Sequence, residues 1–175
     1  MENKNDKTTG FSLVEFIIYL AIFSGVVVVL ITLLFSTIRG RGDVQTKTEV
    51  QQNMRYALSL ITQTIHSATA IDGTPGASLC LTMSDNAKNP TEFDVSNGTL
   101  RITEGSGGGS CPPSGTATPI TSEKVTVTNL TFTKISNPAP AKDTIQVNLT
   151  IEYKDQGNPQ LKFSQNQVTT VSLKQ

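Results

Sequence analysis

An uncharged apolar run over residues 16–35 constrains the fold of this chain more than any other feature. It reads FIIYLAIFSGVVVVLITLLF, and a helix of that length crosses the hydrocarbon core of a bilayer. The sequence after it is polar and rich in Thr, Ser, Asn, Gly and Pro. Because the chain has 175 residues, it can build one modest domain beside the span. The sequence therefore predicts a single-span membrane protein with one domain outside the bilayer.

The segments on either side of the apolar run differ in character. Residues 1–10 are hydrophilic and form a leader, and residues 11–38 contain the transmembrane helix. Residues 39–68 continue as an amphipathic helix, and residues 69–175 form a β-rich soluble domain. A secretory signal places its cleavage site after its apolar stretch, whereas this leader precedes the apolar stretch. Cleavage at the end of the leader would keep the span on the mature chain.

One helix is expected to run through both middle segments. Over residues 12–68 it would be roughly 85 Å long at about 1.5 Å per residue. Gly40 and Gly42 each weaken it by roughly 1 kcal/mol relative to alanine, which indicates a flexible point. Beyond them, apolar residues recur at steps of four and three and form one stripe: Val50, Met54, Leu58, Ile61, Ile65 and Ala68. The stripe needs a partner surface, which the following domain can supply.

The rest of the chain alternates apolar and polar residues, as half-buried antiparallel strands do. Asp72-Gly73 is a turn signal after the helix, and Asn97-Gly98 is a strong hairpin signal. Strands are expected over residues 79–82, 92–96, 99–103, 125–135, 144–154 and 161–173. The predicted fold class is α+β, with a long N-terminal helix packed on an antiparallel sheet. Residues 105–119 are expected to be a loop, either a flexible connector or a binding or subunit-contact loop.

The chain has two cysteines, Cys80 and Cys111, and both lie beyond the span. An even pair in a domain outside the cytosol suggests a disulfide, and two free thiols are the alternative. Closing the loop between these positions would stabilise the fold by roughly 3–4 kcal/mol on chain-entropy arguments.

Composition disfavours several classes of function. Lys and Arg number 14, as do Asp and Glu, and a net charge of zero is unusual for a dedicated nucleic-acid binder. His66 is the one histidine and falls on the polar face of the amphipathic helix, so no zinc site is expected. The carboxylates of Glu92, Asp94, Glu104 and Asp143 show no partner base in the sequence. We therefore expect no enzyme activity, no cofactor and no metal.

The segment from Gly10 to Glu15, GFSLVE, carries the most specific signal. It joins the polar leader to the apolar helix, and Glu15 is the one acid in that helix. A carboxylate in a spanning helix costs roughly 2.5–3.5 kcal/mol, so it usually has a partner. Cleavage after Gly10 would give Phe11 a new α-amino group one helical turn from Glu15. That amine, or the amine of a neighbouring copy, could neutralise the acid, and the second pairing would direct assembly.

These residues resemble the signature of the type IV pilin superfamily, which includes type II secretion pseudopilins and competence pilins. The signature is a Gly followed by Phe, Ser or Thr, Leu, Val and Glu, and the resemblance is close over residues 10–35. It implies that a prepilin peptidase cleaves after Gly10 and N-methylates Phe11, and that Glu15 is the assembly carboxylate. The run LVEFIIYLAIF and residues 61–71 are most similar to minor pilins and J-type type II secretion minor pseudopilins. The span lacks proline, so a proline kink is not expected.

The resemblance implies a structural subunit of a type IV pilus-like filament used in pilus assembly, type II protein secretion or DNA uptake. Its implied partners are other pilin or pseudopilin subunits, the prepilin peptidase and the inner-membrane assembly platform. The implied location is a single pass through the inner membrane with an exported C-terminal domain. Positive charges flank the span equally, with Lys4, Lys7 and the amino terminus before it and Arg39, Arg41 and Lys47 after it. This orientation therefore rests on the cysteines and on the resemblance of the leader. The alternative is a signal-anchored extracytoplasmic binding or adhesin domain.

Overall fold

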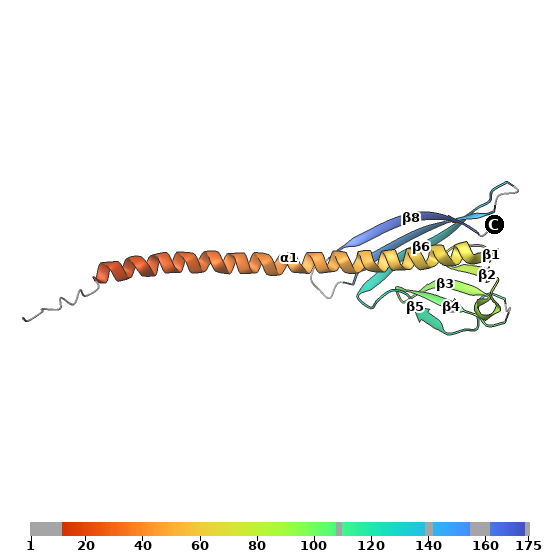
Figure 1. Cartoon of the computed structure of the whole chain (residues 1–175), viewed down its shortest axis with the longest axis horizontal. Coiled ribbons are helices and arrows are strands. Elements are labelled where there is room, and N and C mark those ends of the chain that lie inside the picture. Colours follow the sequence, from red (N-terminus) through yellow and green to blue (C-terminus); the bar gives the residue numbers. More distant parts are fainter. Residues whose placement is uncertain (1–11, 108–109, 139–141, 155–161, 174–175) are drawn as a thin grey trace, which may run out of the picture. The chain divides into compact units, whose positions relative to one another are not determined.

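The computed structural model describes residues 12–107, 110–138, 142–154 and 162–173, with the backbone alone over 38–43 (Figure 1). The chain divides into two compact units, Met1–Gly42 and Asp43–Gln175. The first unit holds the apolar part of a long helix. The second holds the remainder of that helix and all the described strands.

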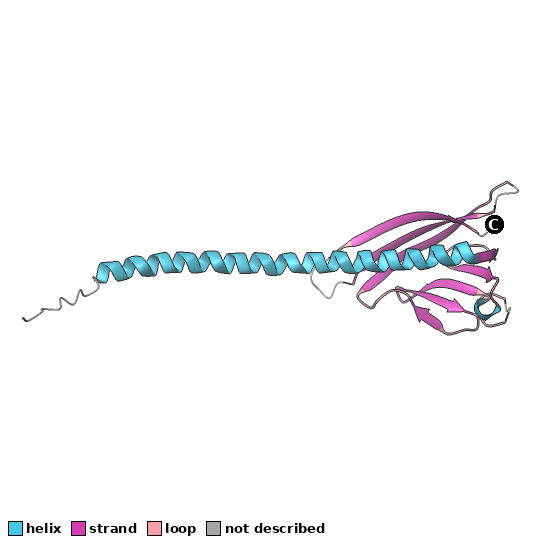
Figure 2. Cartoon of the chain, in the orientation of Figure 1, coloured by secondary structure: helices cyan, strands magenta, loops and turns pink. Residues whose placement is uncertain are grey.

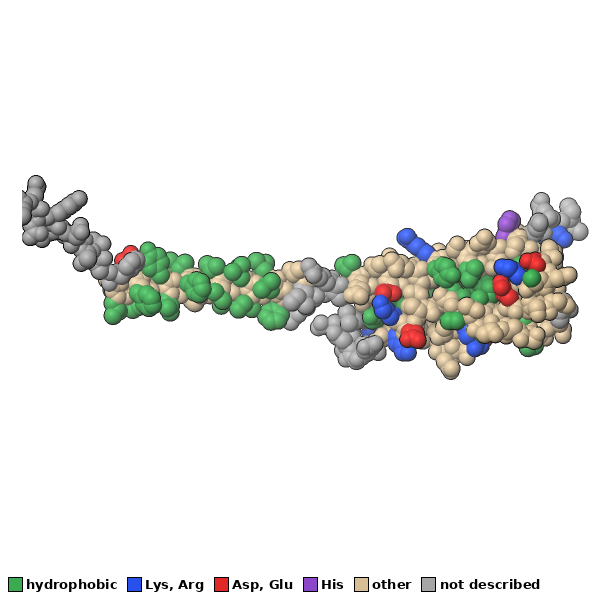
Figure 3. All heavy atoms as spheres, turned by 60° about the horizontal axis from the view of Figure 1, so that its bottom comes forward, with side chains coloured by type: hydrophobic (Ala, Val, Ile, Leu, Met, Phe, Trp, Pro, Cys, Tyr) green, Lys and Arg blue, Asp and Glu red, His purple; other side chains and the backbone are tan. Residues whose placement is uncertain are grey.

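The long helix α1 spans Leu13–Ser67 and confirms the predicted helix to within one residue at each end. Its backbone stays α-helical through Gly40 and Gly42, where the sequence indicates a flexible point. The segment Leu13–Thr37 is long and apolar enough to cross a membrane, with a mean hydropathy of 2.9. None of it is buried by the described residues, and Figure 3 shows the hydrophobic side chains that cover it.

Polar side chains in this apolar segment form their hydrogen bonds within the helix. The hydroxyls of Ser24, Thr32 and Thr37 donate to backbone carbonyls three or four residues earlier, at distances of 2.8–2.9 Å. A bilayer core offers no other hydrogen-bond partner, so these contacts make the hydroxyls compatible with a membrane span.

The strands form two antiparallel sheets in the second unit (Figure 2). The first sheet has the order β1-β2-β3-β4-β5, with β1 Ala68–Asp72, β2 Leu79–Met83, β3 Thr91–Ser96, β4 Thr99–Glu104 and β5 Ala117–Pro119. The second sheet has the order β6-β7-β8, with β6 Val125–Ile135, β7 Thr144–Tyr153 and β8 Ser164–Ser172. A short 3-10 helix, η1 Asn86–Lys88, lies between β2 and β3.

The six predicted strands are present as β2, β3, β4, β6, β7 and β8, with ends that shift by a few residues. The sequence does not predict β1 or β5, and it predicts one sheet where the structure has two. β5 lies inside residues 105–119, which we expected to be loop throughout, and it places Thr118 opposite Ile102 of β4. Three residues are too few to show an alternating pattern, so the sequence carries no signal for this strand.

The second half of α1 shares one hydrophobic core with both sheets. The stripe residues Val50, Met54 and Ile61 are completely buried, and they belong to the same cluster as Phe93 of β3 and Leu149 of β7. This confirms the predicted contact between the apolar stripe and the strands. Full burial of each such aliphatic side chain contributes about 1.5–3 kcal/mol, so this face of α1 is a large part of the domain's stability.

Candidate functional site

Glu15 lies in the first turn of α1, where the N–H of Phe16 donates to the Ser12 carbonyl at 3.2 Å. An acid at this point is stabilised by the positive end of the helix dipole. Its side chain is exposed, and it is the one charged residue of Leu13–Thr37. The candidate assembly carboxylate therefore projects from the end of an uncharged helical segment. Gly10 and Phe11, the predicted cleavage residue and methylated terminus, lie outside the described residues.

The apolar segment itself offers Glu15 no cationic partner. Residues 13–37 contain no Lys, Arg or His. The nearest basic residue after the segment is Arg39, which lies about 36 Å further along a helix that rises about 1.5 Å per residue. A cation for Glu15 must therefore come from the amino-terminal side of the helix or from another molecule.

Cys80 of β2 and Cys111 are joined as a disulfide, as predicted, with their Cα atoms 6.4 Å apart and a sequence separation of 31. Cys80 is buried in the sheet, whereas Cys111 belongs to the segment that precedes β5. A second contact holds the start of that segment, because the N–H of Gly105 donates to the Pro90 carbonyl at 2.7 Å. The described part of residues 105–119 is thus attached to the first sheet at several points and is not a free connector.

Three of the four carboxylates that have no partner in the sequence, Asp94, Glu104 and Asp143, form ion pairs in the fold. Asp94 of β3 pairs with Arg101 of β4. Asp143 pairs with Lys134 at 2.7 Å. Asp94 and Arg101 lie directly opposite each other in the β3–β4 hairpin. They are also equally far from the predicted Asn97-Gly98 turn, so the sequence alone could have predicted this ion pair. These pairs lie at the surface with their side chains partly exposed, and surface ion pairs contribute about 0–1 kcal/mol each.

Among the described carboxylates, Glu92 has a pKa that is shifted from its ordinary value. Burial raises the pKa of Glu92 above its ordinary value, and the negative charge of Asp94 raises it further. A hydrogen bond with Ser78 and the charge of Arg101 act in the opposite direction. Glu92 stands opposite Cys80 in the register of β2 and β3. Glu92 therefore lies on the first sheet, in the second compact unit, whereas Glu15 lies in the first unit.

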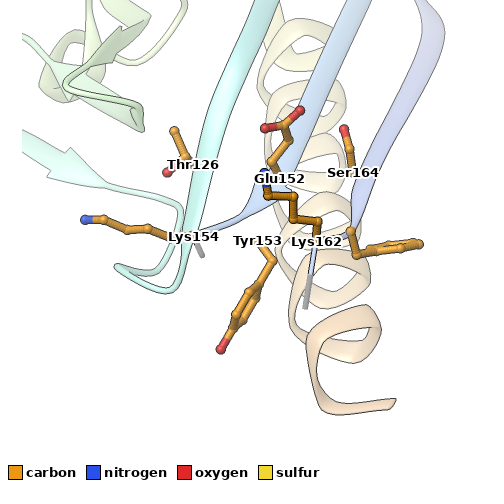
Figure 4. A pocket seen from close by; sticks show the side chains of 7 residues that line it. Thr126, Glu152, Tyr153, Lys154, Lys162 and Ser164 are labelled. Atoms are coloured by element: carbon orange, nitrogen blue, oxygen red, sulfur yellow. The ribbon is translucent and has the colours of Figure 1, made fainter. Parts of the chain in front are cut away.

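A hollow on the second unit has a volume of about 500 Å³ and lies where β6, β7 and β8 meet (Figure 4). Its lining includes Glu152, Tyr153, Lys154 and Lys162. Figure 4 shows Glu152 and Lys154 pointing in different directions, with Tyr153 pointing away from both. Lys154 and Tyr153 therefore do not converge with Glu152 on one point of this hollow.

Among the described residues, one group of side chains has the composition of a metal site. Ligand atoms of Asp72, Cys80 and Cys111 lie within 4.8 Å of one another. Both sulfurs belong to the disulfide, so they are not available as thiolate ligands. The group is therefore a structural bridge beside an exposed carboxylate.

Comparisons with known protein families, with curated proteins and with solved structures find no match to this chain.

Proposed function

We propose that this chain is a structural subunit, of the minor pilin or minor pseudopilin kind, in a type IV pilus-like filament. In this proposal a prepilin peptidase removes residues 1–10 by cleavage after Gly10 and methylates the new amino terminus at Phe11. The span then anchors the subunit in the inner membrane with its C-terminal domain exported. Glu15 guides the subunit into the filament.

The observation that carries the proposal is the position of Glu15. It is the one charge in a 25-residue apolar helical segment, and it stands in the first helical turn, four residues after Phe11. A carboxylate inside a bilayer costs roughly 2.5–3.5 kcal/mol when it is unpaired. The amino terminus of a neighbouring subunit supplies a cation at the same depth in the membrane. An ion pair between Glu15 of one subunit and the amino terminus of its neighbour therefore favours one register of docking between the two helices over others.

The packing of α1 supports a role in assembly. One face of its second half packs on the two sheets, whereas none of Leu13–Thr37 is buried by the described residues of the chain. That segment has lipid or other apolar helices as its surroundings. A filament core made of such helices would bury it, and the soluble unit needs no contribution from it to complete its own core.

The disulfide supports an exported location for the second unit. Disulfides such as Cys80–Cys111 persist in oxidising compartments and are rare in the cytosol. This favours a topology in which the chain beyond Thr37 lies outside the cytoplasm. The proposed partners are accordingly other pilin or pseudopilin subunits, the prepilin peptidase and the inner-membrane assembly platform.

Substitution of Glu15 tests the proposal. We expect Glu15→Ala to be inserted into the membrane normally, because the span only becomes more apolar, but to enter filaments poorly. The measurement is the ratio of this subunit in sheared filaments to that in membranes. Ser24→Ala is the matched control, since it removes another polar group from the same helix without changing its charge.

Two outcomes of that experiment are informative. A lower ratio for Glu15→Ala, with Ser24→Ala unchanged, supports assembly through the carboxylate. An unchanged ratio for Glu15→Ala would contradict the assembly role and favour a single-span anchored binding or adhesin domain.

A further inference from the structure

The two sheets have four outer strands, β1, β5, β6 and β8, and three of these show features that prevent pairing with another strand. The outer side of β6 is already used by hydrogen bonds. The N–H of Val127 donates to the Gly98 carbonyl at 2.7 Å, and the N–H of Phe132 donates to the Gly76 carbonyl at 2.8 Å. A register shift between Val127 and Asn129 further distorts this edge.

The outer strands of the first sheet are short or irregular. β5 has three residues and ends in Pro119, which has no N–H to donate. β1 has five residues, and its pairing with β2 shifts register between Ala68 and Ala70. Short length, proline and bulges are the devices by which proteins protect sheet edges from pairing with other chains.

The remaining edge, β8, has none of these devices in the described structure. It is nine residues long and reads SQNQVTTVS, without a charge, a proline or a glycine. Its pairing with β7 runs from Ser164 to Ser172 without a register shift. Figure 1 shows β8 as the outermost strand of its sheet. A long, regular and uncharged edge is the kind of strand to which another strand adds most readily.

Every second residue of β8 directs its backbone N–H and carbonyl groups away from β7, toward the open edge of the sheet. Two hydrogen bonds at the ends of the strand show which residues face β7 instead. The N–H of Leu173 donates to the Asp143 carbonyl at 3.2 Å, and the carbonyl of Phe163 accepts from the Tyr153 N–H at 2.9 Å. In an antiparallel pair the direction of these groups alternates along the strand. Because odd-numbered residues face β7, the even-numbered residues of β8 direct their N–H and carbonyl groups away from β7.

The side chains of β8 identify the partner strand. Val168 is the middle residue of the strand, and it is 51 % exposed. If the β8 strand of a second copy pairs with this one in antiparallel orientation, and the pairing is centred on Val168, then Val168 lies opposite Val168 of the second copy. In the same register Asn166 lies opposite Thr170, and Ser164 lies opposite Ser172. All of these are even-numbered residues, and no described residue bonds to their outward backbone groups apart from His66, which has a ring nitrogen 3.4 Å from the Ser172 carbonyl. This register overlaps the whole strand, buries the exposed valine and opposes no like charges.

We propose that the edge of β8 is a site of self-association, at which two copies of this chain join their second sheets through antiparallel β8 strands centred on Val168. The contact is isologous, because the same surface is used by both copies. The two copies run in opposite directions along the strand. The contact therefore joins chains of separate assemblies and not successive subunits of one directional filament, and it does not depend on the role proposed for Glu15.

Cysteine cross-linking of the full-length chain after extraction from membranes in detergent tests the contact, because detergent leaves two copies free to pair in opposite directions. A hydrogen-bonded antiparallel pair brings opposing Cα atoms to about 5.5 Å, which is within the range that a disulfide spans. We expect Val168→Cys to give about tenfold more disulfide-linked dimer after mild oxidation than the control Thr133→Cys, because only the first position has its own copy opposite it. Thr133 is an exposed residue of β6, at the far side of the same sheet.

Differently tagged chains with Asn166→Cys and Thr170→Cys determine the orientation. Antiparallel pairing predicts a mixed dimer between them, little dimer from Asn166→Cys alone, and loss of the mixed dimer when Val168→Lys is added, since like charges then face each other. Preferential dimers of Asn166→Cys with itself would overturn the antiparallel register. Equal cross-linking of Val168→Cys and Thr133→Cys would overturn self-association at this edge and leave β8 open to a strand of a different protein.

Discussion

The side-chain carbonyl of Asn53 in α1 accepts a hydrogen bond from the backbone N–H of Ser122 at 2.8 Å. Ser122 lies in the segment that connects the two sheets, between β5 and β6. One helical turn earlier, Glu49 pairs with Lys124 at 2.8 Å. These two contacts fix the connection between the sheets against the polar flank of α1.

Removing the Asn53 acceptor should destabilise the second unit modestly. We expect Asn53→Ala to lower the free energy of unfolding of residues 43–175 by about 1 kcal/mol, the usual net contribution of one such hydrogen bond. Asn53→Asp keeps an acceptor oxygen at the same position and should lose less. Urea unfolding of both variants measures the difference, and equal losses would show that the bond with Ser122 does not matter.

The apolar stripe of α1 should be essential for the second unit to fold without the span. We expect residues 43–175 to fold as a soluble unit, and Ile61→Asp to destabilise it by about 3 kcal/mol or more, because a charge is buried without a partner. Ser59→Asp is the matched control, since Ser59 is exposed on the same helix. Thermal unfolding followed by circular dichroism compares the two, and a normal melting transition for Ile61→Asp would contradict the packing of α1 on the sheets.

The disulfide should be present in exported protein and should stabilise the first sheet. We expect both cysteines to resist alkylation in the absence of reductant, and Cys111→Ser to lower the free energy of unfolding by about 3 kcal/mol. Mass spectrometry after alkylation tests the first expectation and denaturant unfolding the second. Two freely alkylated thiols in exported protein would contradict the bridge.

Glu92 gives a prediction about pH. Burial and the charge of Asp94 raise its pKa in the folded state, so the folded protein holds this proton more tightly than the unfolded chain does. The contribution of this bound proton to the free energy of unfolding is complete at pH values below the pKa of Glu92 in the unfolded chain. It is lost as the pH rises through the higher pKa of Glu92 in the folded protein. Glu92→Gln should therefore raise the melting temperature relative to wild type at neutral pH, and the difference should disappear in acid. A difference that grows on acidification would contradict the perturbed acidity of Glu92.

Much of this fold follows from periodicity in the sequence. The stripe from Val50 to Ile65 predicts which face of α1 is buried, and the Asn97-Gly98 turn predicts the β3–β4 hairpin. These signals are local, because a helix or a hairpin brings residues only a few positions apart in the sequence onto one face. The pattern of apolar residues on that face can therefore be recognised without knowing which element packs against it.

The parts that the sequence does not predict depend on contacts between distant segments. The division into two sheets rests on interactions such as Asn53 with Ser122, 69 positions apart. β5 forms because β4 offers it an edge, and three residues show no period of their own. The candidate site is the opposite case, since Gly10, Phe11 and Glu15 are defined by their order along the chain and by the apolar segment after them.

The structure of the mature amino terminus tests the central proposal most directly. The chain should be produced together with a prepilin peptidase, recovered from membranes and analysed by intact mass and amino-terminal fragmentation. We expect it to begin at Phe11 with one methyl group on its α-amine, and Gly10→Leu to retain residues 1–10. A wild-type chain that keeps its leader in the presence of the peptidase, or one that begins after Thr37, would contradict the proposal that this protein is a subunit of a pilus-like filament.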